Sequence, residues 1–358
     1  MKSLPQLFSP LKIRELTLKN RIVVSPMCQY SAEDGVPNDW HLVHLGSRAV
    51  GGAAVVIAEA TAVSPEGRIS PNDLGIWNQD QVTAFKKITQ FIKQQNSIAG
   101  IQIAHAGRKG STPVPWAARG PLESKDGAWT PVAPSAIAFS PTYPNPKELT
   151  SIEINSVVEQ FTVAGKNALD AGFELVEIHM AHGYLLNEFL SPLTNKRTDE
   201  YGGSIENRMR LPLIIAEKIR GLWPQKWPVL VRISATDWAD GGWTLEDSIQ
   251  FSKKLKDIGI DLMDCSSGGS IADAKIKTGP GYQVEFSHGV RQATGMLTGA
   301  VGMITSPEQA ERILNEGQAD IVLLARELLR DPYWPLHAAK ALNAEIEWPK
   351  QYDRAKIK

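Results

Sequence analysis

Two histidines and a tyrosine are closely spaced after an apolar run of the chain, at His179, His182 and Tyr184. An imidazole can donate or accept a hydrogen bond near neutral pH, and a phenol can donate a proton. The trio could therefore bind a carbonyl or nitro oxygen of a substrate and supply a proton. Two alternatives stay open, namely interior histidines that are simply hydrogen-bonded and a metal site. A histidine pair without a third ligand nearby is a weak zinc signature.

Polar residues after other apolar runs suggest a planar, electron-accepting, anionic ligand. Gln102 and Arg232 could contact a ring that gains negative charge on reduction, and an unpaired arginine in an apolar strand would be costly. Backbone amides near Gly302 and the guanidinium of Arg326 would suit a phosphate. Cys28 is explained equally well as a small buried residue. Together these residues favour redox chemistry on a bound ring.

Eight apolar runs could position these residues, at 21–25, 53–58, 98–104, 175–179, 229–233, 262–266, 296–301 and 321–325. Amphipathic segments separate most of them, and their starts carry helix-capping signals at Thr150, Thr244 and Ser306. Crossover helices imply parallel strands, and eight parallel strands close naturally into a single-domain (β/α)₈ TIM barrel. The alternative is an open doubly wound sheet, but the sequence contains neither of the glycine-rich phosphate motifs that would anchor one.

Composition excludes several classes of protein. The chain has 358 residues, which could mean two or three domains at about 150 residues each, but α/β barrels often exceed that size as one unit. Lys and Arg total 38 against 39 Asp and Glu, so we expect no electrostatic binding to nucleic acid or to a membrane. Two cysteines cannot build a disulfide scaffold or ligate an iron–sulfur cluster. We expect one domain over residues 1–358, without a secretory signal and located in the cytoplasm.

Two stretches interrupt the alternation of strands and helices. Residues 108–146, after the third strand, are rich in Pro, Gly, Ser and Trp and show no sustained period. A loop of this length in a compact fold is usually functional. Residues 345–358 are polar and aromatic, and predict either a frayed tail or an arm that docks on another surface.

Several segments of the chain, taken together, resemble the Old Yellow Enzyme flavoproteins over essentially its whole length. These segments are Ser25-Pro-Met-Cys28-Gln-Tyr30, Glu59-Ala-Thr61, Gln102-Ile-Ala-His105-Ala-Gly-Arg-Lys109, His179-Met-Ala-His182-Gly-Tyr184, Asn195-Lys-Arg-Thr-Asp-Glu-Tyr-Gly-Gly-Ser204, Glu206-Asn-Arg208 and Thr298-Gly-Ala-Val-Gly302. Cys28, the histidine pair and the terminal Gln351-Tyr-Asp-Arg354 are similar to the bacterial branch of NADPH dehydrogenases and xenobiotic reductases.

The resemblance implies a TIM barrel that binds FMN non-covalently and oxidises NAD(P)H, with NADPH favoured. The residues expected to bind FMN are Ser25, Pro26, Met27, Cys28, Ala60, Gln102, Arg232, Gly302, Ala325 and Arg326. The family usually has glycine where Ala325 stands, so a phosphate contact there requires that the alanine keep a negative φ. No metal is implied.

The resemblance also implies reduction of activated alkenes (enones, enals, nitroalkenes and quinones) by hydride transfer from flavin N5. Tyr30, His179, His182 and Tyr184 would form the substrate pocket, with the histidines polarising the substrate oxygen and Tyr184 protonating the α-carbon. Cys28 would tune the flavin. Arg354 would enter the active site of a neighbouring subunit, which requires a homodimer or homotetramer.

Three competing functions remain to be weighed. A 2,4-dienoyl-CoA reductase shares the barrel, but its iron–sulfur cluster needs more cysteines than this chain has. A metal-dependent hydrolase would use His179 and His182 as ligands, and zinc in a colourless protein would reveal it. A flavin-binding protein that stores or senses would fail to oxidise NADPH in the presence of an alkene.

Overall fold

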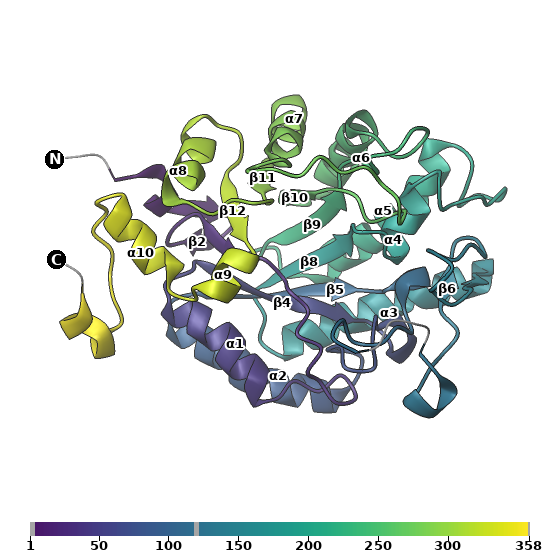
Figure 1. Cartoon of the computed structure of the whole chain (residues 1–358), viewed down its shortest axis with the longest axis horizontal. Coiled ribbons are helices and arrows are strands. Elements are labelled where there is room, and N and C mark those ends of the chain that lie inside the picture. Colours follow the sequence, from purple (N-terminus) through teal and green to yellow (C-terminus); the bar gives the residue numbers. More distant parts are fainter. Residues whose placement is uncertain (1–3, 118–121, 357–358) are drawn as a thin grey trace.

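Eight parallel strands close into a barrel in the computed structural model, which describes residues 4–117 and 122–356 (Figure 1). The barrel strands, each hydrogen-bonded to the next along the chain and the last to the first, are β3 (Ile22–Val24), β4 (Val55–Ala62), β5 (Ile98–Ala104), β8 (Leu175–Met180), β9 (Val229–Ser234), β10 (Leu262–Ser266), β11 (Leu297–Ala300) and β12 (Ile321–Leu324). Each of the eight apolar runs forms one of these strands, so the predicted single-domain (β/α)₈ barrel is confirmed.

Helices surround the barrel, and the predicted capping signals start three of them. The helices are α1 (Asp39–Val50), α2 (Gln79–Gln94), α3 (Ser151–Asp170), α4 (Leu185–Leu190), α5 (Ile205–Leu222), α6 (Leu245–Ile258), α7 (Val284–Thr294), α8 (Pro307–Asn315), α9 (Arg326–Arg330) and α10 (Trp334–Ala341). The side chains of Thr150, Thr244 and Ser306 accept hydrogen bonds from backbone amides of α3, α6 and α8. Among the described residues, no helix is long and apolar enough to cross a membrane.

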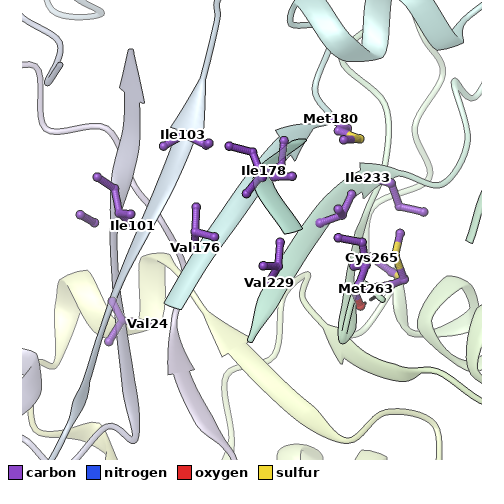
Figure 2. Packing of buried hydrophobic residues seen from close by; sticks show 14 of the residues in the cluster. Val24, Ile101, Ile103, Val176, Ile178, Met180, Val229, Ile233, Met263 and Cys265 are labelled. Carbon is purple, nitrogen blue, oxygen red and sulfur yellow. Dashed lines mark hydrogen bonds between the residues drawn. The ribbon is translucent and has the colours of Figure 1, made fainter. Parts of the chain in front are cut away.

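The larger of two apolar cores lies between the barrel and its helices. Outward side chains on neighbouring strands form rows within it, and Ile103 stands beside Ile178 just as Met180 stands beside Ile233 (Figure 2). Cys265 extends the second row onto β10. This continuous outer packing makes the barrel a rigid support for residues at its strand ends.

The interior of the barrel changes from apolar to polar toward the carboxyl ends of the strands. Three leucines on β8, β9 and β10 belong to the inner apolar core, namely Leu175, Leu230 and Leu262. Two residues further along each strand, on the same inward face, come Glu177, Arg232 and Asp264. The next inward positions hold His179, Ser234 and Ser266. Polar side chains therefore gather at one end of the barrel.

A short antiparallel hairpin closes the opposite end of the barrel. Its strands are β1 (Leu11–Ile13) and β2 (Leu16–Leu18), and Ile13 and Leu18 belong to the inner apolar core. The sequence did not indicate this hairpin, because strands of three residues are too short for an alternating pattern to show.

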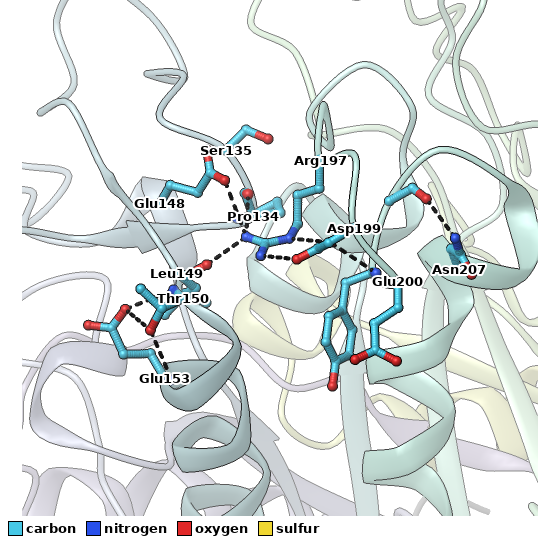
Figure 3. Close-up of polar contacts among 12 residues, drawn as sticks. Pro134, Ser135, Glu148, Leu149, Thr150, Glu153, Arg197, Asp199, Glu200 and Asn207 are labelled. Atoms are coloured by element: carbon cyan, nitrogen blue, oxygen red, sulfur yellow. Dashed lines mark hydrogen bonds and ion pairs between the residues drawn. The ribbon is translucent and has the colours of Figure 1, made fainter.

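The long stretch after β5 is irregular, as predicted, but is tied to the barrel. It contains the two-residue strand β6 (Val132–Ala133), which pairs with β7 (Lys147–Glu148); residues 118–121 lie outside the described residues. Arg197 donates hydrogen bonds to the carbonyl oxygens of Pro134 and Leu149, and it forms an ion pair with Asp199 (Figure 3). One buried guanidinium thus joins the stretch to the segment that precedes α5.

Candidate active site

Three aromatic rings meet where β8 ends at the polar mouth of the barrel. The ring centroid of His179 lies 5.1 Å from that of His182 and 5.2 Å from that of Tyr184, both in edge-to-face contact. His179 is the last inward residue of β8, and His182 and Tyr184 are half-buried in the turn before α4. The structure therefore brings the predicted trio together.

The backbone at His182 is held in a conformation that few side chains adopt. Its φ is +63°, in the left-handed region, and its amide donates to Ser234 Oγ at 2.8 Å. Its Nε2 lies 2.7 Å from Ser266 Oγ. Contacts from β9 and β10 thus maintain the strained residue, as is common at functional sites.

Both histidines are neutral at physiological pH. Burial lowers the pKa of His182 to about 3, with Arg232 and Lys109 adding to the effect. Burial, His182 and the same two cations hold the pKa of His179 well below its usual value. A neutral imidazole still carries one N–H donor. His179 Nδ1 is buried without a hydrogen-bond partner among the described residues.

The segment after β3 faces this trio from across the mouth. Burial and nearby carboxylates raise the pKa of the Cys28 thiol, which hydrogen-bonds with Tyr30. Burial, together with Cys28 and Tyr30, holds the pKa of Tyr184 well above its usual value, so both the thiol and the phenol are protonated. A cavity of about 10 Å³ lies beside Tyr184 and Ala60. The thiol is therefore a neutral neighbour of the site, without the thiolate character of a nucleophile.

Two inward side chains present free polar atoms at the predicted flavin position. Arg232 lies with Nε 2.7 Å from Asp264 Oδ2 and donates from Nη2 to Ser25 Oγ at 2.7 Å. No hydrogen bond from its Nη1 is found among the described residues. Gln102 donates from Nε2 to Glu177 Oε1 at 2.7 Å, and within the described chain its carbonyl oxygen has no donor. Ala60 is the register partner of Gln102 on β4.

The residues predicted to contact the phosphate, Gly302, Ala325 and Arg326, follow the ends of β11 and β12. Gly302 has a φ of +121°, and a Cβ there would lie 2.9 Å from Gln283 Nε2 and 3.0 Å from a ring carbon of Tyr282. Ala325 has a φ of −105°, and this negative value is what a phosphate contact at an alanine requires. Arg326 is exposed, and no described residue forms an ion pair with it. Ser25 is buried, and Pro26 and Met27 are half-buried after β3.

These residues fit FMN. A hydrogen-bond acceptor at Gln102 and a donor at Arg232 match the N–H and carbonyl groups of a flavin pyrimidine edge, and both atoms lack partners within the described chain. Arg326 beside Gly302 offers a cation and a backbone without a side chain, which suits a phosphate. No group of three or more histidine, cysteine or carboxylate side chains is arranged to hold a metal ion within residues 4–117 and 122–356.

The predicted contribution of Arg354 is not made within this chain. Arg354 is exposed in a short 3₁₀ helix, η5 (Lys350–Ala355), that is held by a contact of Tyr352 with Tyr333. Figure 1 places this arm beside α10, on the opposite side of the molecule from β6.

Lys109 was noted in the sequence without a role, and two further charged residues, Glu177 and Asp264, were missed. Lys109 Nζ lies 5.0 Å from the ring centroid of Tyr184 and donates to the carbonyl oxygen of His182 at 2.8 Å. Burial lowers its pKa to about 8. Glu177 and Asp264 lie inside the barrel below the mouth. Their signal was present in the sequence, since each is two residues before a polar strand end and therefore shares its face.

A flavin-binding barrel oxidoreductase is the class of protein that this fold and site define. A sequence model of the NADH:flavin oxidoreductase / NADH oxidase family matches residues 6–345. The chain belongs to this family, that of the Old Yellow Enzymes, and is an FMN-dependent enzyme that oxidises a nicotinamide coenzyme.

Named relatives agree with this assignment. The chain is 47% identical over 350 residues to the NADPH dehydrogenase of Geobacillus thermodenitrificans (strain NG80-2), which covers 97% of this chain and 98% of that protein. It is 47% identical over 351 residues to the NADPH dehydrogenase of Bacillus subtilis (strain 168), with 98% of each covered.

Solved structures also superimpose closely. Morphinone reductase in complex with tetrahydroNAD gives a TM-score of 0.80 at 26% identity, over 97% of this chain and 93% of that one. A complex of 2-naphthoyl-CoA reductase with 2-naphthoyl-CoA gives a TM-score of 0.85 at 27% identity. The alignment covers 94% of this chain and spans 52% of that larger one.

Proposed function

We propose that the enzyme reduces the C=C bond of activated alkenes (enones, enals, nitroalkenes and quinones) with NADPH as the electron donor. FMN, when bound, would supply hydride transfer through its N5 atom. The names of the two bacterial relatives support the choice of NADPH. The proposal depends chiefly on one observation, that the neutral His179 contacts both His182 and the protonated Tyr184 at the mouth of the barrel.

His179 and His182 would bind the carbonyl or nitro oxygen of the alkene through their N–H groups. Neutral donors suit this role, because they stabilise negative charge developing on the oxygen without first pairing with another anion. A donor aimed at such charge is typically worth about 2.7–4 kcal/mol. Tyr30 would complete the pocket from the opposite side of the mouth.

Tyr184 would protonate the α-carbon of the alkene. Its raised pKa keeps the proton on the phenol until negative charge reaches the substrate. A positioned acid contributes roughly 10²–10⁴-fold to rate. Cys28, with a protonated thiol, would tune the flavin and the fit of the substrate.

An anaerobic titration of the FMN-loaded enzyme with NADPH, followed by an enone, tests the function. We expect NADPH to bleach the flavin and the enone to restore its colour, with the saturated ketone as product. In Tyr184→Phe, bleaching should be unchanged and recolouring slower by about 10²-fold or more. Reoxidation by the enone at the wild-type rate in this variant would contradict the assignment of Tyr184.

We also propose that Arg354 reaches the active site of a second subunit in a homodimer or homotetramer. Two observations support an interface, namely the position of the arm outside its own barrel and the exposed Trp40 and Val43 on α1. Arg354→Ala should raise the KM for the enone in a protein that stays oligomeric by sedimentation and binds FMN normally. An unchanged KM would argue against a contribution of Arg354 to the neighbouring active site.

We propose a cytoplasmic location for the enzyme, with which the free thiols of Cys28 and Cys265 agree.

A further inference from the structure

A continuous row of polar contacts runs across the inside of the barrel below the mouth. Gln102 on β5 donates to Glu177 on β8, and the Glu177 carboxyl group lies against that of Asp264 on β10. Asp264 pairs with Arg232 on β9, which donates to Ser25 at the end of β3. The row thus links the two side chains that present free polar atoms at the flavin position.

The contact between the two carboxyl groups requires a proton. Glu177 and Asp264 are both fully buried. Neither Glu177 Oε2 nor the oxygens of Asp264 receive a hydrogen bond from a donor in the described chain. Two ionised carboxylates in contact away from water would repel each other strongly, whereas a shared proton turns the contact into a hydrogen bond.

The proton belongs on Glu177. Asp264 faces the Arg232 guanidinium at 2.7 Å, which favours its anionic form. Glu177 instead accepts from a neutral amide through Oε1, which leaves Oε2 free to carry the proton and donate it to Asp264. Burial and the charge of Asp264 raise the pKa of Glu177 to about 8, in agreement with this assignment.

We propose that Glu177 is a positioning residue which, as a neutral acid, fixes the orientation of Gln102 and leaves Asp264 as the single counter-charge of Arg232 behind the flavin. Because Glu177 accepts the amide N–H of Gln102, the carbonyl oxygen of Gln102 points away from it, free to accept from the ring. Arg232, Asp264 and neutral Glu177 together carry no net charge. This inference rests on the proposed placement of FMN against Gln102 and Arg232.

Loss of the proton from Glu177 would change the charge of the row, although the ionised carboxylate would still accept from Gln102. The row would gain one negative charge next to the position where reduced flavin is itself negative, so reduction would favour uptake of a proton by Glu177. The charged groups that act on Glu177 are Asp264 from β10 and Arg232 from β9. Gln102 on β5 is uncharged, and His179, next along β8, is neutral. Inward residues of the remaining strands nearby are uncharged, as in Ile57, Gly299 and Leu323.

The test is the midpoint potential of bound FMN as a function of pH, in wild type and Glu177→Gln. The amide of glutamine can accept from Gln102 and donate to Asp264, so it imitates the neutral acid but cannot ionise. Above about pH 8, the wild-type potential should fall with a slope of one more proton per two electrons than that of Glu177→Gln. Below that pH, the two proteins should have the same slope and bind FMN with Kd values within about threefold.

Two further variants make the result decisive. Glu177→Leu cannot accept from Gln102, and we expect its Kd for FMN to rise by about tenfold or more. Arg232→Met should lower the flavin potential, which checks the placement of the ring independently of alkene reduction. If Arg232→Met leaves the potential unchanged, the ring lies elsewhere and the inference fails with its premise.

Identical pH slopes in wild type and Glu177→Gln would overturn the inference while leaving the proposed alkene reduction intact. Infrared difference spectra give a second measurement that needs no redox titration. Wild type at pH 7 should show the carbonyl stretch of one more neutral carboxylic acid than Glu177→Gln, while the bands of the other buried acids, such as Glu59 and Glu188, remain in both. Identical carbonyl bands in the two proteins would show that Glu177 does not carry the proton.

Discussion

His179 and His182 illustrate how burial selects a protonation state for a site. An exposed histidine changes charge between pH 5 and 8, but these two lie beside Arg232 and Lys109 and stay neutral throughout that range. Binding of an uncharged enone should therefore vary little with pH as far as the histidines are concerned. A hydrogen bond with Ser266 on β10 orients the His182 ring, whereas His179 Nδ1 has no partner among the described residues.

Removing one histidine tests its role as a hydrogen-bond donor to the oxygen of the ligand. We expect His179→Ala to weaken the binding of a phenolic ligand by roughly 10²-fold, since one directed donor is worth about 2.7–4 kcal/mol. A spectral titration of the flavin measures this affinity. His337→Ala, an exposed histidine paired with Asp331 on the outside of the barrel, is the matched control and should behave as wild type. Unchanged affinity in His179→Ala would count against the oxygen contact.

The Cys28 thiol is expected to adjust the site without reacting. Cys28→Ala should retain FMN and turn over, with an altered flavin spectrum and altered KM for the enone, because a protonated thiol contributes polarity and volume. Absorbance and steady-state assays measure both effects. Cys265→Ala removes the other thiol from the outer core and should leave the spectrum unchanged. Complete loss of turnover with the flavin retained would require a chemical role for Cys28.

At the scale of strands and helices, the sequence predicted the elements well because their signals are local. The capping pairs at Thr150, Thr244 and Ser306 start helices as expected. Glu177 and Asp264 were overlooked because a strand buried on both faces looks almost uniformly apolar, although each acid shares its face with the polar residue two positions further on. Their role depends on partners from neighbouring strands, which only the closed barrel brings together.

The irregular stretch after β5 is expected to depend on one side chain. Arg197→Met should lower the free energy of unfolding by about 3 kcal/mol, because buried carbonyl oxygens that lose their donor cost about 1–3 kcal/mol each. Denaturant unfolding measures the change, and limited proteolysis should show faster cleavage between β6 and β7. Lys125→Met, which removes an exposed ion pair with Glu123 in the same stretch, should change stability by less than about 0.5 kcal/mol.

For the whole molecule, buried acids and histidines have opposite effects on stability. Carboxyl groups with a pKa raised to about 7 or 8 are Glu59, Asp73, Glu177 and Glu188. Each binds a proton in the folded state that the unfolded chain releases near its ordinary pKa of 3.8 (Asp) or 4.5 (Glu), so its contribution is present below that pH and is lost as the pH rises toward 7 or 8. Buried histidines, with lowered pKa values near 3 or 4, contribute stability above pH 6.5 and lose it toward pH 4.

The free energy of unfolding should therefore decrease between about pH 6.5 and 7.5, where the histidine contribution is complete and the acids are still losing theirs. One such carboxyl contributes at most about 1.4 kcal/mol per pH unit. Urea unfolding at several pH values measures the slope, and Glu177→Gln should make it shallower. An increase in stability across this window would contradict the protonated state of the buried acids.

The hairpin that closes one end of the barrel bears on the order in which the coenzyme and the alkene bind. Because Ile13 and Leu18 fill that end with apolar side chains, within the described residues the polar mouth is the end at which substrates would enter and leave. Under the proposed function, the oxidised coenzyme would leave the cavity before the alkene binds there. The reduced flavin would then hold the two electrons in the interval between the two binding events.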